Sequence, residues 1–342
     1  MGGSAGDLRE TMRTDHHEEP FKASIDVLSM TMSIVICCHS MERLGDIREC
    51  VYSVLDQSWP LCQVIVAVDH NAELLDKLRA EMPDLVKVVP NAGVKGLSDT
   101  RNAGISHSTG DIIAFIDDDA TAARDCIERL MDQYRVRSVV AVGGQSVPVW
   151  AEGRPGWFPE ELDWIVGSTY KGAPETVQQV VRLIGCNMSF RKRAFEIAGI
   201  FSTELGRVDE SGEGEDSEIC MRIQRRIPGT MILYEPKAVV HHKVPPHRAT
   251  FRYLISRSHS GGLAVARIGR MYSEPEEAPL ATSMERSYLR YLVASGLGGR
   301  MRHAYRPSVA AQMFAILTSI AASGAGYVVG RARPRKPHKV ES

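Results

Sequence analysis

The chain has 342 residues, a length that suits one large domain or two of ordinary size. It is 44% hydrophobic and 24% charged, with a formal net charge of −1, which indicates a folded protein and no overall nucleic-acid-binding character. The 7 cysteines form no C-x-x-C pair, so we expect buried free thiols in a reducing compartment. Residues 1–28 are polar and lack the apolar core of a signal peptide, and we expect a disordered tail there.

Strands and helices alternate through the first part of the chain. Apolar runs predict strands at 32–38, 63–68 and 86–89, and helical periodicity predicts helices at 44–55 and 73–81. This alternation is typical of a doubly wound parallel sheet. The segment from Cys38 to Gly45 lacks Gly-x-Gly-x-x-Gly, so we expect no dinucleotide cofactor.

A glycine-rich loop follows, from Asn91 to Gly104, and it leads into a further helix. Ser98 or Asp99 is the expected N-cap, and Arg101 then lies on the first turn. A cation is unfavourable at that end of the helix dipole. Either an anionic ligand beside Arg101 or a salt bridge to Asp99 would remove the conflict.

The central motif of the chain runs from Gly110 to Ala120. Its apolar residues 112–116 predict a strand buried on both faces, and the strand ends at Asp117, Asp118 and Asp119. Buried carboxylates so close together need a counter-cation or water. Ligands bind at this end of the strands in open α/β sheets. We therefore predict a divalent-metal site that holds a phosphorylated substrate.

The second half of the chain continues with a helix at 122–134 and a strand at 139–142. Residues 148–174 have no regular period and predict an insert over a pocket. The aromatic residues in this insert would either line an acceptor groove or simply pack together; they are Trp150, Trp157, Phe158 and Trp164. A strand at 182–190 and a helix at 193–198 should follow.

An acidic loop at 211–218 opens into a helix that continues from Ile219. Acidic residues favour a helix N-terminus, which is one explanation of the loop. Gly212 and Gly214 favour another, because they let the backbone bring carboxylates close to a ligand. Extended segments at 231–235 and 237–240 then end at His241 and His242.

The order of these motifs resembles the family 2 glycosyltransferases, inverting enzymes with the GT-A fold. The resemblance covers about residues 33–262 and rests on five segments: "GLSDTRNAGI", "GDIIAFIDDDA", "IGCNMSF", "GEGED" and "VVHH". It implies an α/β protein with a Rossmann-like, mostly parallel central sheet flanked by helices. The catalytic domain would span 29–262, with a nucleotide-binding half at 29–147 and an acceptor half at 148–262. Residues 263–342 would form a helical C-terminal region.

The resemblance also implies a role for each residue that matches a family motif. The nucleotide sugar would be bound by His39, Ser40, Arg43, Asp69, Arg101 and Asp117, with Arg101 near the diphosphate. Mn²⁺ or Mg²⁺ would be bound by Asp119, Asp117 and His241, with His242 as the alternative histidine. Asp118 would point away from the ligand, because alternate residues of an extended segment face opposite ways. Asp216 would be the catalytic base, with Glu215 and Asn187 on the acceptor side.

Together these roles imply a metal-dependent transferase that moves a sugar from a nucleoside diphosphate, UDP being favoured, to an acceptor hydroxyl. The chain lacks the Gln/Arg-x-x-Arg-Trp motif of processive synthases, so we expect single additions to a glycan or polyprenyl-linked acceptor. The segment around "GEGED" and the segment "HHKVPPHR" are similar to a branch that includes glucosyl-dolichyl-phosphate glucuronosyltransferases. The alternatives are a non-catalytic binder of sugar nucleotides or lipid phosphates and a nucleotidyltransferase. The latter would have a glycine-rich basic loop after the first strand, which this chain lacks.

The C-terminal region combines an apolar segment with basic flanks. Residues 308–329 contain no charged side chain, whereas arginines occur on both sides. The segment could lie on an anionic bilayer, span a membrane, or pack on the soluble domain. We expect a cytoplasmic protein with peripheral contact to the cytoplasmic face of the membrane. Upstream, Arg248, Arg252 and Arg257 would be phosphate ligands or solvated charges.

Overall fold

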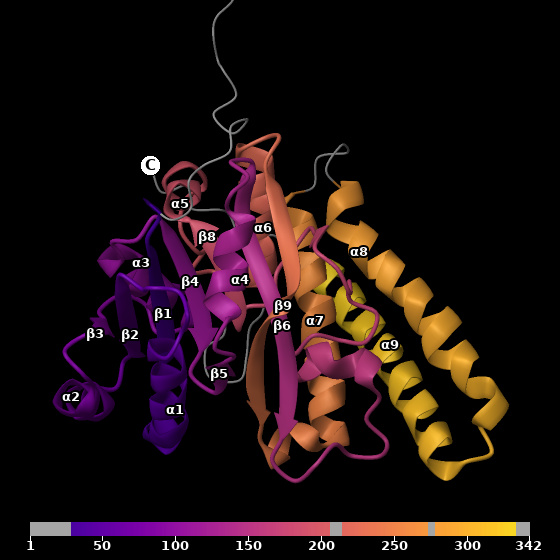
Figure 1. Ribbon diagram of the computed structural model, residues 1–342. Helices are drawn as coiled ribbons and strands as arrows, with labels where there is room; N and C mark the ends of the chain where they lie inside the picture. Colours follow the sequence, from indigo (N-terminus) through magenta and orange to yellow (C-terminus); the bar gives the residue numbers. More distant parts are fainter. Residues whose placement is uncertain (1–28, 206–213, 273–277, 333–342) are drawn as a thin grey trace, which may run out of the picture.

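The computed structural model describes residues 29–205, 214–272 and 278–332, without the side chains of 278–284. The predictions for residues 1–28 and for Gly212 lie outside these ranges. Figure 1 shows a central sheet with helices on both faces and a separate group of helices, α7 to α9, beside it. The strand order is β3-β2-β1-β4-β8-β6-β9-β5, with β7 paired to β9.

The bounds of the elements agree closely with the predictions in the first half of the chain. The strands are β1 (Met32–Cys38), β2 (Gln63–Asp69), β3 (Val86–Asn91), β4 (Ile112–Asp117), β5 (Ala120–Ala122), β6 (Val139–Trp150), β7 (Gln178–Gln179), β8 (Asn187–Arg191) and β9 (Met231–Val244). The α-helices are α1 (Leu44–Leu55), α2 (Ala72–Glu81), α3 (Leu97–His107), α4 (Cys126–Gln133), α5 (Lys192–Ala198), α6 (Glu215–Arg226), α7 (Phe251–Met271), α8 (Ala278–Tyr291) and α9 (Pro307–Ala332). Shorter helical segments are η2 (Met41–Arg43), η3 (Glu160–Val166), η4 (Pro246–Ala249), η5 (Leu292–Leu297) and η6 (Gly298–His303).

The register of the parallel strands brings their carboxyl ends to one edge of the sheet. Cys37 of β1 is paired with Asp117 of β4, and Asp69 of β2 is paired with Asn91 of β3. On the other side of β4 the sheet changes direction, because β8 runs antiparallel to it. β4 is therefore a central strand of the mixed sheet. Its carboxyl end lies at the edge of the sheet where ligands bind in α/β proteins.

Two predicted helix starts are wrong. Helix α3 is not capped by Ser98 or Asp99; it begins after Gly96, whose φ of 137° suits glycine and no L residue. The Ser98 hydroxyl instead donates to the Leu205 carbonyl, and Asp99 accepts from the Val94 amide. The predicted helix at 122–134 begins only at Cys126, because Ala122 ends β5 and residues 123–125 lie between the strand and the helix.

The second half of the sheet also differs from the prediction. The two extended segments at 231–240 are one strand, β9, which continues through both histidines. Strand β6 pairs with it in parallel along nearly its whole length, with register shifts at two points. A bulge interrupts the alternation of apolar and polar residues, so the sequence pattern of one bulged strand predicts two short strands.

The apolar core has a layer on each face of the sheet and a third cluster beneath the C-terminal helices. In the second layer, Phe115 lies edge-on to the rings of Phe190, Phe195 and Phe201. The third cluster includes Phe158 of the predicted insert, and Trp150 and Trp157 pack against its ring. These three aromatic residues therefore pack against one another.

Helices α7 and α9 are packed through very small side chains. A Cβ atom added at Gly262 or Gly326 would lie 2.0 Å from a backbone carbonyl oxygen of the other helix. Ser258 and Ser319 share a buried hydrogen bond of 2.9 Å across the same interface. Small residues that bring two backbones together are common where apolar helices associate. One face of α9 is thus packed against the domain.

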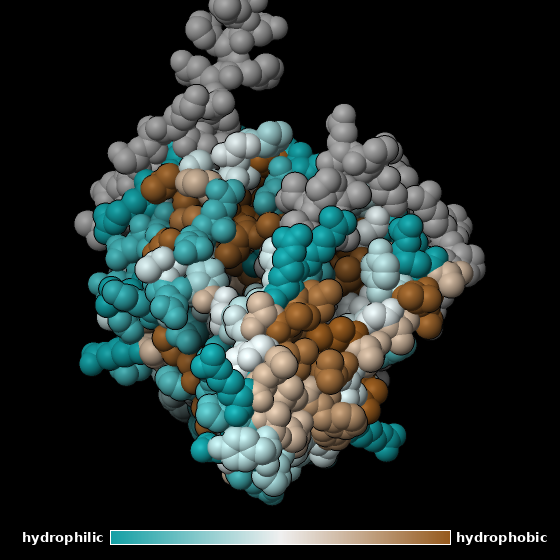
Figure 2. Space-filling model, turned by 90° about the vertical axis from the view of Figure 1, so that its right-hand side faces the viewer, coloured by the Kyte–Doolittle hydropathy of each residue, from teal (hydrophilic) through white to brown (hydrophobic). Residues whose placement is uncertain are grey.

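The other face of α9 is exposed and apolar. Phe314, Leu317 and Val328 are 62%, 52% and 66% exposed. Figure 2 shows an apolar patch on the side of the molecule formed by the C-terminal helices. In length and composition α9 is sufficient to cross a membrane, and it is the one such helix in the described ranges.

Candidate active site

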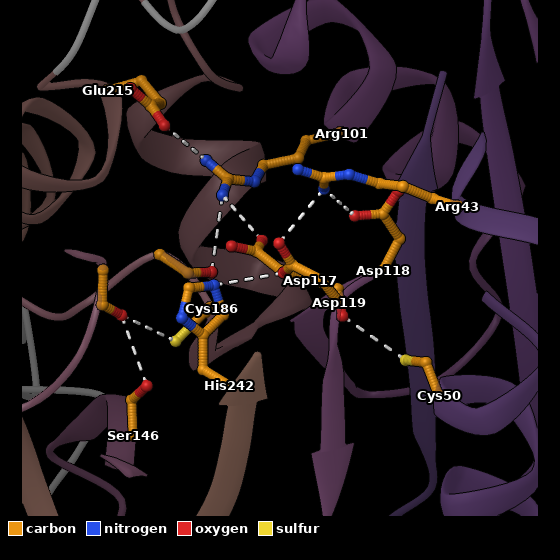
Figure 3. A network of polar contacts seen from close by, with 12 residues as sticks. Arg43, Cys50, Arg101, Asp117, Asp118, Asp119, Ser146, Cys186, Glu215 and His242 are labelled. Carbon is orange, nitrogen blue, oxygen red and sulfur yellow. Dashed lines mark hydrogen bonds and ion pairs between the residues drawn. The ribbon is translucent and has the colours of Figure 1, made fainter. Parts of the chain in front are cut away.

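The acidic residues predicted to bind metal gather at the carboxyl end of β4 (Figure 3). Asp117 and Asp119 lie there with His242 of β9, and their ligand atoms are all within 4.8 Å of one another. Nε2 of His242 is 3.1 Å from Oδ1 of Asp119. His242, not His241, is the histidine at this site. His241 is exposed, because alternate residues of β9 face opposite sides and Ala120 of β5 is paired with His242.

Asp118 and Asp119 share one guanidinium group, that of Arg43. Its Nη1 lies 2.6 Å from Oδ1 of Asp118 and 3.1 Å from Oδ2 of Asp119. Burial raises the pKa of Asp118 to about 7, even though Arg43 opposes the shift. Burial acts on Asp119 too, but His242 and Arg43 outweigh it and hold its pKa below the usual range. Asp119 therefore remains a carboxylate at neutral pH, the form that a metal ligand requires.

Two buried polar atoms beside this group are left without a hydrogen-bond partner within the described residues. They are Oδ2 of Asp118 and Nδ1 of His242. Buried polar atoms normally have a partner, so such atoms indicate a missing ligand, ion or water. Together with two carboxylates and an imidazole, they fit a divalent-cation site.

Arg101 lies between the metal-type residues and the helix that carries the predicted base. It is 2% exposed, with Nη1 2.8 Å from Oε1 of Glu215 and Nη2 3.7 Å from Oδ1 of Asp117. The Gly185 carbonyl accepts a further hydrogen bond of 3.4 Å from Nη2. Of the two alternatives for Arg101, the salt bridge to Asp99 is not formed among the described residues, and Arg101 instead joins β4 to the start of α6.

Asp216 occupies the first turn of α6, next to Glu215. Its Oδ1 accepts hydrogen bonds from the amide of Ser217 at 2.6 Å and from the Ser217 hydroxyl at 3.2 Å. Burial and the neighbouring charge of Glu215 raise the pKa of Asp216, and Arg101 opposes them. A Cβ atom added at Gly185 would lie 2.9 Å from Nη2 of Arg101 and 3.6 Å from Oδ2 of Asp216, so the lack of a side chain there leaves room for the Arg101 guanidinium group.

Other predicted nucleotide-binding residues lie at the same edge of the sheet. Ser40 caps the short helix η2 by accepting from the Glu42 amide at 3.2 Å, and His39 is exposed beside it. The carboxylate of Asp69 accepts from the Gly96 amide at 2.9 Å and from Asn91 at 3.0 Å. Asp69 thus fastens the glycine-rich loop to β2, a contact within the protein that uses both of its oxygens.

Asn187, predicted on the acceptor side, is completely buried at the start of β8. Its amide nitrogen donates to the backbone carbonyls of Gln145 and Ala238. These bonds join β6 to β9 where their register shifts. Its Oδ1 has no hydrogen-bond partner among the described residues.

One residue belongs to the site more firmly than its sequence indicated. Arg248 is 7% exposed, and its Nη1 lies 3.6 Å from Oδ2 of Asp119. It is not a solvated helix charge, because it lies in η4, directly after β9, and not on α7. In the sequence, the indication of this role was that Arg248 follows closely after His241 and His242.

Comparison with known proteins now defines the family. The model for glycosyl transferase family 2 matches residues 33–197. The glucosyl-dolichyl phosphate glucuronosyltransferase of Haloferax volcanii is 34% identical over 320 residues, which cover 92% of this chain and all of that protein. The chain belongs to glycosyl transferase family 2.

A more distant relative agrees with this assignment, and a solved structure shows the fold. The succinoglycan biosynthesis protein ExoM of Rhizobium meliloti is 28% identical over 70% of this family 2 chain and 75% of its own length. A mannosyltransferase of Pyrobaculum calidifontis, solved with GDP-Man and Mn²⁺, matches with a TM-score of 0.56 at 17% identity over 91% of each chain. The fold is therefore GT-A, as expected. This family 2 protein is a glycosyltransferase that uses a nucleotide-sugar donor.

Proposed function

We propose that the protein is a metal-dependent, inverting glycosyltransferase that adds one sugar from a UDP-sugar to an acceptor hydroxyl. One observation carries this proposal: two acidic sites with different surroundings contact the two terminal nitrogens of one buried guanidinium group, that of Arg101. Arg101 contacts Asp117 of the metal-type group at 3.7 Å and Glu215, next to Asp216, at 2.8 Å. Sugar transfer needs one such site for the leaving diphosphate and another for the attacking hydroxyl.

On the donor side, Asp117, Asp119 and His242 would hold the cation. When bound, a divalent cation neutralises the charge that grows on the leaving diphosphate. Two carboxylates with one imidazole suit Mn²⁺ better than Mg²⁺, which prefers oxygen ligands alone. The choice of a histidine in place of a third oxygen therefore favours Mn²⁺.

On the acceptor side, Asp216 would take the proton of the attacking hydroxyl. Its raised pKa makes it a stronger base than an ordinary carboxylate. Its Oδ1 is held by Ser217, so Oδ2 remains for the acceptor. A single displacement with no covalent intermediate inverts the anomeric centre.

For the acceptor, we infer a polyprenyl-linked substrate that is reached at the cytoplasmic face of a membrane. The relative that matches over its whole length is named for a dolichyl phosphate substrate. The exposed stripe of α9, formed by Phe314, Leu317 and Val328, would lie on the bilayer. The exposed side chains of Arg302, Arg306 and Arg331 near the two ends of α9 would meet anionic headgroups.

The proposed activity is tested by a thermal-shift panel of sugar nucleotides with and without Mn²⁺, followed by a transfer assay. We expect UDP-sugars, UDP-glucuronate among them, to raise the melting temperature more with Mn²⁺ than with EDTA, since ligands that bind the folded state stabilise it. Stabilisation without turnover on any polyprenyl-phosphate glycan would favour the non-catalytic binder. Stabilisation that does not depend on Mn²⁺ would contradict the metal site.

Membrane contact is tested by flotation with liposomes. The intact protein should float with vesicles that contain anionic lipid, and less with vesicles of phosphatidylcholine alone. The double change Phe314→Ser and Leu317→Ser should reduce flotation, because it removes apolar side chains that are more than half exposed. The exposed pair Tyr52→Ser and Leu85→Ser, far from α9, is the matched control. Equal flotation of both variants would contradict the proposed surface.

A further inference from the structure

The metal-type carboxylates already have cationic partners from the protein itself. Arg43, Arg101 and Arg248 all lie within 4 Å of Asp117, Asp118 or Asp119. The three arginines differ in how firmly they are enclosed: the side chain of Arg43 is 27% exposed, whereas those of Arg101 and Arg248 are 2% and 8% exposed. Only Arg43 has an open path to solvent.

Within the described part of the chain, the ion pairs of Arg43 are those with Asp118 and Asp119. Arg43 ends η2 and occupies the N-cap position of α1, where it makes no capping hydrogen bond with its side chain. A cation at that end of a helix is opposed by the helix dipole. Its contacts with Asp118 at 2.6 Å and Asp119 at 3.1 Å are therefore what holds the side chain inward.

A charge balance shows what a metal ion meets at this site. Four carboxylates (those of Asp117, Asp118, Asp119 and Glu215) face the three guanidinium groups, so the ionised side chains of this group sum to −1 when His242 is neutral. A divalent cation that enters alone would add excess positive charge next to Arg43, in surroundings that screen it poorly. A divalent cation that enters with a doubly negative diphosphate leaves the balance unchanged.

We propose that Arg43 is a built-in counter-cation for Asp118 and Asp119, and that it makes metal binding depend on the nucleotide diphosphate. Without a donor, Arg43 pairs with Asp119 and weakens its affinity for a metal ion. With a donor, the diphosphate offers Arg43 another anion, and Asp119 becomes free for the metal. Arg43 is thus a positioning residue that acts through Asp119. The inference rests on the metal site of the proposed function and adds that the metal ion binds well only together with the donor diphosphate.

The test measures Mn²⁺ binding to the full chain by electron paramagnetic resonance of free Mn²⁺, with and without saturating UDP. In the unaltered protein, UDP should raise the affinity for Mn²⁺ by about 5–150-fold, the range typical of coupled sites. Arg43→Gln should bind Mn²⁺ alone more tightly than the unaltered protein does, and the enhancement by UDP should fall toward unity. Arg43→Lys keeps the charge but replaces the planar guanidinium group with a compact ammonium group, so its enhancement should be intermediate.

Arg48→Gln is the matched control, because Arg48 lies on α1 and pairs with Glu81, away from the carboxylates. In this variant, UDP should enhance Mn²⁺ binding as much as it does in the unaltered protein. The inference is overturned if Arg43→Gln, or Arg43→Lys should the first variant not fold, binds Mn²⁺ alone no more tightly while UDP still enhances binding. That result would leave the metal site itself intact. Failure of the unaltered protein to bind Mn²⁺ even with UDP would instead overturn the metal site, and this inference with it.

Discussion

Asp216→Asn is expected to lower the turnover number by about 10²–10⁴-fold, the usual contribution of a general base, while donor binding remains. The amide can still accept from the Ser217 amide, as Oδ1 does now at 2.6 Å, so the start of α6 should be preserved. What is lost is the carboxylate that removes the proton of the acceptor. The measurement is single-turnover transfer at saturating donor, alongside calorimetric titration of UDP with Mn²⁺.

The matched control for this change is Asp125→Asn, which alters a carboxylate at the start of α4 that pairs with Arg129 at 3.0 Å on the surface. It should leave turnover unchanged. The pH profile adds an independent readout. Because the pKa of Asp216 is raised, this base becomes protonated at a higher pH than an ordinary carboxylate does. As the pH is lowered, the rate of the unaltered enzyme should therefore begin to fall at that higher pH. That acid limb should be missing in Asp216→Asn, and a variant with normal turnover would exclude Asp216 as the base.

Asp119→Ala is expected to abolish the effect of Mn²⁺ on donor binding, a loss of roughly 5–150-fold in the affinity for UDP measured with the metal. Asp119 contributes one oxygen toward His242 and the other toward Arg43, so no neighbouring carboxylate can replace it. The measurement is calorimetric titration of UDP with Mn²⁺ and again with EDTA. The two titrations should agree in the variant and differ in the unaltered enzyme.

Removal of Asp119 also leaves buried cations without their partner, which costs about 3–5 kcal/mol when a buried pair is broken. Asp119→Asn keeps the shape of the side chain and separates this loss of stability from the loss of metal binding. Asp132→Ala, which removes a surface partner of Arg135, is the control for general effects. Mn²⁺-dependent UDP binding that persists in both Asp119 variants would contradict the assignment.

The strands that form the donor half were predictable from local sequence. β1 has the predicted bounds, and β2 and β4 differ by one residue, because each is a short apolar run that a polar side chain ends. The same reasoning missed the start of α3, where the conformation of Gly96 and not a capping side chain decides the first turn. Local patterns predict an element well when burial alone defines it.

The second half was less predictable, because its elements depend on pairing with distant strands. The predicted helix at 122–134 begins four residues late, after β5, which pairs antiparallel with the part of β9 that carries both histidines. Asn187 has the chemistry of a ligand-binding residue but satisfies two carbonyls inside the sheet. Neither fact is visible in the residues themselves, since each depends on the register of β9.

The sequence by itself determined the chemistry of this protein: an acidic strand end, a second acidic site at a helix start, and motifs in the order of family 2 glycosyltransferases. Only the tertiary structure decided which side chains meet. It selected His242 over His241, because strand alternation has no absolute phase until β5 and β9 are paired. It also brought Arg101 to Glu215 across 114 positions and Arg43 to Asp118 across 75. Charges so far apart in the chain find one another only through the packed sheet, and no spacing rule encodes that contact.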